Sequence, residues 1–168
     1  INPCDFNQTK AATIAIAEHD GPVYLRFGRP KWPVFTPEDQ KFEIGRAILM
    51  REGSDVSIFS TGHCVSESLI AADELQEKGI SAEVINIHTI KPLDEMAILS
   101  SVSKTGKVVT AEEHQMHGGL GDSIAQLLAR KLPTAMEMVA VDDSFGESGT
   151  PNELFEKYGL SASNIVEA

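Results

Sequence analysis

The sequence predicts an α/β domain whose sheet is mostly parallel and covered by helices on both faces. The first observation is the stretch 81–94, where four apolar β-branched residues stand close together and no charge lies between Glu83 and Lys91. Runs of this kind are typical of parallel strands that are buried on both sides. The second observation is that strand and helix patterns alternate over about 125 residues, which indicates a doubly wound sheet with right-handed crossovers.

A third observation indicates that the sheet is mixed. The strand predicted between Phe42 and Met50 is separated from the strand at 55–60 only by a tight turn at 52–54. Only antiparallel neighbours can be joined through so short a connection. We therefore expect the first strand of the domain to run antiparallel and to pair with the second.

The other elements follow from apolar spacing and from residues that start or stop helices. Asp94 offers an N-cap, and Gly79 stands just past the preceding helix. Residues 150–153 form a capping box with proline at the first helical position. The elements expected here are a helix at 65–78, a strand within 81–90, a helix at 94–104, a strand at 107–110, a helix ended by Pro133, a strand at 136–141 and a helix at 150–158.

Residues 1–36 are expected to be the end of a preceding unit together with a linker. Asn7 or Thr9 could cap a helix over about residues 9–19, and residues 23–27 favour a short strand. These two elements cannot close a core alone. The stretch 28–40 contains three prolines and no sustained periodicity, which is typical of a semi-rigid linker. We place the domain itself at 37–168 and expect the chain to be a piece of something longer.

Charge and composition exclude several kinds of partner. The net charge of −11 argues against nucleic acid and against an anionic membrane surface, because both are bound through patches of Lys and Arg. No stretch approaches about 18 uninterrupted apolar residues, and no signal peptide is visible. The two cysteines, Cys4 and Cys64, make no disulfide framework, so a cytoplasmic location is expected.

Two short segments could carry chemistry but have simpler structural explanations. The glycines of 118–121 follow a strand and open a helix, where backbone amides could hold a phosphate. Their spacing fits neither a dinucleotide-binding motif nor a P-loop, so tight turning and close packing are favoured. His63 beside Cys64 could indicate an activated thiol, but a small buried cysteine is the simpler interpretation. His19 needs no role beyond favouring a helix C-terminus.

Glu112, Glu113, His114 and His117 resemble a set of metal ligands. Their spacing matches no common metal-binding motif, and no further ligand is near in sequence. A surface loop or a domain interface is the favoured interpretation of this cluster.

Arg26 and Arg29 flank the end of an apolar strand at a domain edge, in a strongly acidic chain. Guanidinium groups suit bidentate recognition of phosphate or carboxylate. An ordinary salt bridge with one of the 25 acidic residues is an equal alternative. Nothing else in the chain assembles into a self-sufficient active site, so no catalytic residue is assigned.

Six motifs occur in an order that resembles the C-terminal part of transketolase, especially the split bacterial form with separate N- and C-terminal subunits. The resemblance covers essentially the whole chain. Related 1-deoxyxylulose-5-phosphate synthases and 2-oxo acid dehydrogenase β subunits share much of the pattern. The motifs are GPVYLR at 21–26, IGRA at 44–47, REGSDV at 51–56, TIKPLD at 89–94, TAEEH at 110–114 with GGLG at 118–121, and FGxSG at 145–149.

The resemblance implies a three-layer α/β/α domain with a five-stranded mixed sheet whose first strand is antiparallel. It implies that residues 1–36 end a pyrimidine-binding domain and that residues 37–168 serve mainly assembly. Arg26 matches the family arginine that contacts the substrate phosphate, whereas Arg29 has no equally secure counterpart.

The activity implied for the full assembly is the transfer of a two-carbon ketol unit from a ketose phosphate to an aldose phosphate. Thiamine diphosphate and Mg²⁺ would be held mainly by an N-terminal section or subunit, and neither is expected on this chain alone. The implied assembly is a homodimer, or a heterotetramer if the enzyme is split. The alternatives are a 1-deoxyxylulose-5-phosphate synthase, a 2-oxo acid dehydrogenase β subunit, or a stand-alone phosphate- or nucleotide-binding domain.

Overall fold

The computed structural model describes residues 1–168 and shows five strands alternating with helices. No helix is both long enough and apolar enough to cross a bilayer. The elements in chain order are α1 (Phe6–Ala17), β1 (Ile48–Arg51), β2 (Val56–Ser60), α2 (Cys64–Glu77), β3 (Ala82–Asn86), α3 (Glu95–Thr105), β4 (Val108–Gln115), α4 (Leu120–Lys131), β5 (Met136–Val141), α5 (Pro151–Lys157) and α6 (Ala162–Glu167).

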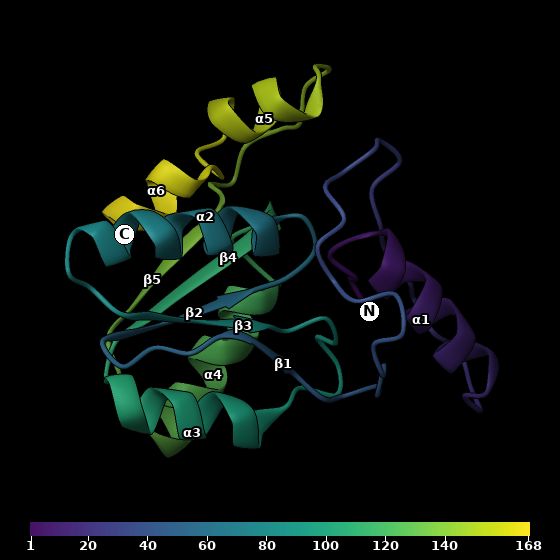
Figure 1. Ribbon diagram of the computed structural model, residues 1–168, viewed down its shortest axis with the longest axis horizontal. Coiled ribbons are helices and arrows are strands. Elements are labelled where there is room, and N and C mark those ends of the chain that lie inside the picture. The colour runs from purple at the N-terminus through teal and green to yellow at the C-terminus, as the bar shows by residue number, and fades with distance from the viewer.

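The five strands form one mixed sheet in the order β1-β3-β2-β4-β5. Only β1 is antiparallel to its neighbour, and the other three pairings are parallel. Helices α2, α5 and α6 lie above the sheet and α3 and α4 below it, whereas the chain before β1 lies to one side (Figure 1). The predicted three-layer architecture and the antiparallel first strand are confirmed.

The predicted pairing of the first strand with the second is wrong, because β3 lies between them. β1 pairs with β3 instead, and the short connection to β2 crosses over the end of β3. The amides of Ser54 and Asp55 both donate to the carbonyl of Ser81, just before that strand. A Cβ on Gly53 would lie 2.2 Å from backbone atoms of Ala82 and Glu83. The tight turn therefore serves this crossing, which turn length alone did not distinguish from a hairpin.

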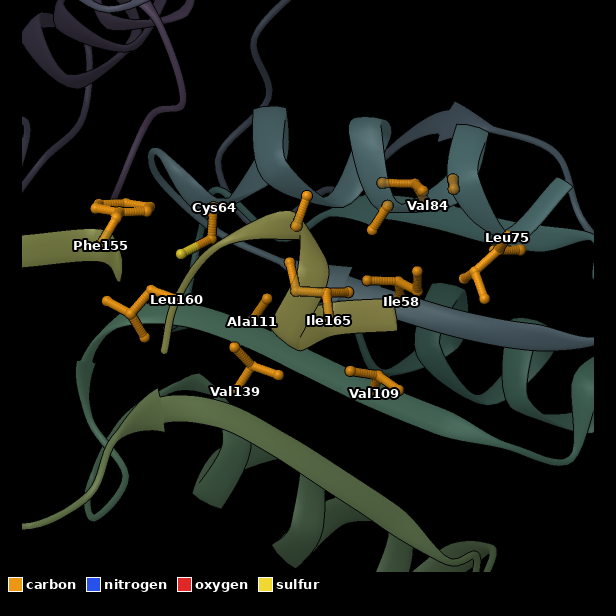
Figure 2. Packing of buried hydrophobic residues seen from close by; sticks show 14 residues of the cluster. Ile58, Cys64, Leu75, Val84, Val109, Ala111, Val139, Phe155, Leu160 and Ile165 are labelled. Atoms are coloured by element: carbon orange, nitrogen blue, oxygen red, sulfur yellow. The ribbon is translucent and has the colours of Figure 1, made fainter. Parts of the chain in front are cut away.

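Alternating side chains build two separate cores, one on each face of the sheet. Ile58, Val84 and Val109 point toward α2 and α6, as Figure 2 shows. Their direct neighbours in sequence, among them Phe59 and Ile85, belong to the core under α3 and α4. Because successive residues of a strand face opposite sides, a strand buried on both faces is apolar along most of its length. This is the physical basis of the uncharged run at the centre of the sequence.

Several boundaries differ from those predicted. The N-cap of α1 is Asp5, whose carboxylate accepts hydrogen bonds from the amides of Gln8, Phe35 and Thr36, rather than Asn7 or Thr9. Residues 23–27 belong to no helix or strand. The strand expected within 42–50 is confined to β1, β4 extends well beyond the predicted 107–110, and α6 was not predicted. The other helices and strands, with the caps at Asp94 and Thr150, lie within a few residues of their predicted positions.

The proline-rich linker is anchored through its tryptophan. The Trp32 ring stacks on His63 with centroids 4.2 Å apart and contacts Phe155 at 5.3 Å. Its indole nitrogen donates to Ser66 Oγ at 2.8 Å. The segment before β1 is therefore held against the start of α2 rather than trailing free in solvent.

Gly53→Ala should destabilise the chain by about 1–3 kcal/mol, because the new methyl group overlaps the backbone of β3. The matched control is Gly146→Ala, since no atom lies within 4 Å of the position its methyl group would take and its φ is not positive. Urea unfolding of the two variants measures the difference. Equal midpoints would contradict the described crossing of the β1–β2 connection over β3.

Candidate functional site

A pocket of about 380 Å³ lies where the carboxyl ends of β2, β3 and β4 meet the N-terminal segment. Thr61 follows β2, Ile90 follows β3, and His114 belongs to the end of β4, while Tyr24 and Arg26 come from the segment before β1. Parallel α/β sheets bind ligands at this edge. A larger pocket of about 740 Å³ lies at the opposite edge, beside the first residues of β2, β4 and β5, and is mostly apolar. We therefore take the smaller pocket as the candidate site.

The topology places this pocket at the switch point of the sheet. From β2 the chain crosses through α2 to β3 on one side, and from β3 it returns through α3 to β4 on the other side. The two crossover helices lie on opposite faces (Figure 1), so a crevice opens between the ends of β2 and β4. Thr61 and Glu112 line it from these two strand ends.

Arg26 reaches the pocket from the N-terminal segment and is held by the end of β4. Its Nη2 donates to the carbonyl oxygen of Glu113 at 2.7 Å. The pairing of β4 with β2 ends at Ser60–Ala111, so no β2 residue lies opposite Glu113. On the other side, between the pairs Ala111–Val139 and Gln115–Val141, three residues of β4 lie opposite one residue of β5. Arg26 takes part in none of the ion pairs of the chain, so the salt-bridge alternative is not observed. Its guanidinium charge is therefore available to a ligand.

Glu113 connects Arg26 to a stacked histidine. Its carboxylate oxygen Oε2 lies 3.2 Å from Nδ1 of the buried His63 ring. That ring stacks on Trp32, and it also meets Gly28 so closely that a Cβ there would lie 2.1 Å from the imidazole. The ring thus has one packed orientation, which orients the Glu113 side chain while the Glu113 carbonyl holds Arg26.

The Gly-rich turn does not leave a free phosphate position. The buried carboxylate of Glu112 accepts hydrogen bonds from the amides of Leu120 and Gly121, both at 2.8 Å, and so caps the N-terminus of α4. A Cβ on Gly119 would lie 2.1 Å from this carboxylate, and one on Gly121 would lie 2.8 Å from Met138 Sδ. The packing interpretation of these glycines is confirmed. An anion already occupies the place that a nucleotide phosphate would need.

Burial raises the pKa of Glu112 above its ordinary value, although the two amide donors act in the opposite direction. Desolvation of the carboxylate thus raises its pKa by more than the hydrogen bonds from the helix N-terminus lower it. The group is a structural cap with a proton affinity that is higher than usual.

The remaining sequence candidates divide between the pocket and other places. His114 lines the pocket, and so does His19, whereas His117 does not. Arg29 lines a different cavity beside α1, away from Arg26's pocket. No group of three His, Cys, Asp or Glu side chains is placed to hold a metal ion. The four residues that resembled a metal cluster are therefore spread over a helix cap, a histidine contact and two exposed positions.

Both cysteines are free and buried. Burial first, and then the nearby carboxylates of Glu113, Glu67 and Glu112, raise the pKa of the Cys64 thiol well above its ordinary value. A thiol with a raised pKa is a poor nucleophile at neutral pH. The simple interpretation of Cys64 as a buried apolar residue is confirmed by its place in the core under α2 (Figure 2).

Sequence reasoning missed the contacts between Glu113, His63 and Arg26. These residues lie far apart along the chain, since Arg26 and Glu113 are 87 positions apart, and only folding brings them together. The signals that were available were Arg26 itself and the unusual run of two glutamates and a histidine after an apolar strand. Nothing local indicated that the backbone carbonyl of Glu113 would hold the arginine.

The fold and the pocket define a three-layer α/β domain with an antiparallel edge strand and a pocket at its switch point. Residues 45–165 match the family of transketolase C-terminal domains. The 6-deoxy-6-sulfo-D-fructose transketolase subunit of Clostridium sp. (strain MSTE9) is 48% identical over 99% of this chain and 52% of that protein. An apulose-4-phosphate transketolase subunit of Phocaeicola vulgatus is 34% identical over 98% of this chain and 53% of that protein.

A solved split-gene transketolase, described as an inactive tetramer of beta subunits, superposes with a TM-score of 0.95 at 43% identity. The match covers 98% of this chain and 54% of that one. The chain belongs to the transketolase family and corresponds to its C-terminal part. It spans about half the length of the relatives that it matches. The resemblance found in the sequence is confirmed.

Glu112→Gln should change how stability depends on pH. The pKa of Glu112 in the folded chain is raised above the ordinary value of 4.5. The contribution of this carboxyl to the free energy of unfolding is therefore fully present below pH 4.5 and is lost as the pH rises through the raised pKa. The free energy of unfolding of the wild type, relative to the variant, should therefore fall across this window.

Urea unfolding at a series of pH values upward from moderately acidic conditions measures this difference. Glu156→Gln, at an exposed position of α5, controls for loss of one negative charge. A wild-type-minus-variant difference that stays flat or rises with pH would contradict the raised pKa.

Proposed function

We propose that this chain works in an assembly that transfers a two-carbon ketol unit from a ketose phosphate to an aldose phosphate. In this proposal Arg26 binds the phosphate end of the sugar. The observation that carries it is the Arg26 guanidinium, free of any ion pair and held by the carbonyl of Glu113 at the edge of the switch-point pocket. Binding energy gathered at the far phosphate positions the reacting carbonyl, which is how remote contacts accelerate a reaction elsewhere on the substrate.

The chemistry itself is assigned to the part of the assembly outside this chain. Thiamine diphosphate, with Mg²⁺, would supply the carbanion that transketolase chemistry requires. The residues of this chain do not fit that group, since no side chains are placed to hold a metal ion and Glu112 already caps α4. The role proposed for this chain is therefore substrate binding and assembly.

We propose that the partner is an N-terminal transketolase section or subunit, and that the two form a heterotetramer if the enzyme is split. Two relatives are described as subunits, which supports this arrangement. The solved relative supports it too, because it is a split-gene protein whose tetramer of beta subunits is described as inactive. We further propose that residues 1–36 end a pyrimidine-binding domain. The exposed Phe6 and Ile14 on α1 support this, because both are apolar side chains that a larger domain would cover. A cytoplasmic location is proposed from the two free cysteines.

The chain alone should be folded but inactive in ketol transfer from xylulose 5-phosphate to ribose 5-phosphate with thiamine diphosphate and Mg²⁺. Activity should appear when the N-terminal subunit is added, because that subunit would bring the cofactor site. Activity with pyruvate as donor instead would favour a 1-deoxyxylulose-5-phosphate synthase or a 2-oxo acid dehydrogenase. Activity of the chain alone would contradict the proposed division of labour.

Arg26→Gln in the assembled enzyme should raise the KM for a sugar phosphate by about tenfold or more, since a hydrogen bond to a charged group is lost. The KM for the corresponding unphosphorylated sugar should change little. Arg29→Gln is the matched control, because Arg29 is exposed and lines a different cavity. Equal effects of the two substitutions would contradict the role proposed for Arg26.

A further inference from the structure

We propose that His114 is a second ligand for the anionic end of the substrate, so that the C-terminal domain takes part in recognition as well as in assembly. The inference rests on the proposed function and extends the site around Arg26. The ligand class is a sugar that carries a terminal tetrahedral oxyanion, either a phosphate or a sulfonate.

His114 and Arg26 are neighbours in the structure. His114 and Arg26 line the same pocket, one from the end of β4 and the other from the segment before β1. The Arg26 guanidinium is bonded to the carbonyl of Glu113, the residue directly before His114. The bulge of β4 lies at these residues, and bulges re-aim side chains at the ends of strands.

The backbone fixes which nitrogen of the His114 ring carries the proton. Nδ1 lies 2.8 Å from the carbonyl oxygen of Gln115. A carbonyl can only accept, so Nδ1 must carry the proton of this hydrogen bond. Nε2 has no hydrogen-bond partner within the chain, and the His114 ring belongs to none of the ion pairs. The backbone thus fixes the tautomer and leaves Nε2 open to a ligand. In functional histidines, too, the hydrogen bond made by one ring nitrogen determines the state of the other.

The pocket is basic although the chain is acidic. The chain carries 25 acidic and 14 basic residues, yet this pocket is lined by Arg26, Lys91, His19 and His114. Its single carboxylate, Glu112, is turned inward onto the amides of α4. A pocket that is basic in an acidic protein favours an anion, and it concentrates the field on that anion.

Nε2 can serve this anion in two ways. In the imidazolium form it donates a hydrogen bond to an oxyanion, and in the neutral form it accepts one from a singly protonated phosphate. A sulfonate has no such proton, so it can use only the donating form. A phosphorylated sugar can therefore bind Nε2 in either form of the ring, whereas a sulfonated sugar can bind only the donating form.

The decisive variant is His114→Asn in the assembled enzyme. The Asn side-chain nitrogen can still donate to Gln115 as Nδ1 does, but nothing replaces Nε2. We expect the KM for a sugar phosphate to rise about five- to tenfold, with the KM for the unphosphorylated sugar unchanged. His114→Gln, whose amide nitrogen reaches the position of Nε2, should recover part of the loss. His117→Asn is the matched control, since that exposed histidine is close in sequence and does not line the pocket.

Inorganic phosphate and sulfate, as competitors of the sugar phosphate, give an independent readout, and both should inhibit His114→Asn less strongly than the wild type. Sulfonated and phosphorylated sugars, assayed in parallel, identify which oxyanion the natural substrate carries. A KM that rises equally for phosphorylated and unphosphorylated sugars would show a general structural defect and overturn the inference.

Arg26→Gln separates this inference from the proposed function. If Arg26→Gln raises the KM selectively while His114→Asn behaves as His117→Asn does, the role of His114 is wrong and that of Arg26 stands. If only His114→Asn acts selectively, the pocket binds the anion and the role proposed for Arg26 is wrong. If neither variant acts selectively, both proposals fail.

Discussion

The arrangement of the candidate site depends on one buried interaction, the carboxylate of Glu112 against the N-terminus of α4. Two amides hold the carboxylate, and burial makes its charged form costly. The interaction ties β4 to the first residues of α4, and Gly119 lies so close to the carboxylate that a Cβ there would overlap it. A helix N-terminus is a common place for an anion, and here the protein supplies the anion itself.

From that anchored point, consecutive residues of β4 take different tasks. Glu112 points into the protein, Glu113 meets His63 and holds Arg26 through its carbonyl, and His114 reaches the pocket. A regular strand would engage its carbonyls in the ladder on both sides. Beyond Ala111, β4 has no partner in β2 and pairs irregularly with β5, and the Glu113 carbonyl accepts from a side chain of another part of the chain.

Several polar and aromatic contacts join the N-terminal segment to the domain. Trp32 stacks on His63, Asp5 ties α1 to the amides of Phe35 and Thr36, and the Asn2 amide donates to the carbonyl of His88. Burial is also what lowers the pKa of His88 to about 4, so this histidine is neutral at the junction. A junction of this kind places the segment that carries Arg26 through several directed contacts.

The sequence by itself determined the layers of the fold, because apolar periodicity, helix caps and the uncharged run from Val84 to Ile90 are local consequences of burial on both faces of a parallel sheet. It also singled out Arg26 and the packing role of the glycines at 118–121. Only the tertiary structure decided that β3 separates β1 from β2, since a tight turn and a crossing over a strand end can have the same length. The same holds for the site, where Arg26 donates to the backbone carbonyl of Glu113, 87 positions away in the sequence. Every residue has such a carbonyl, so no pattern of residue types could predict this contact.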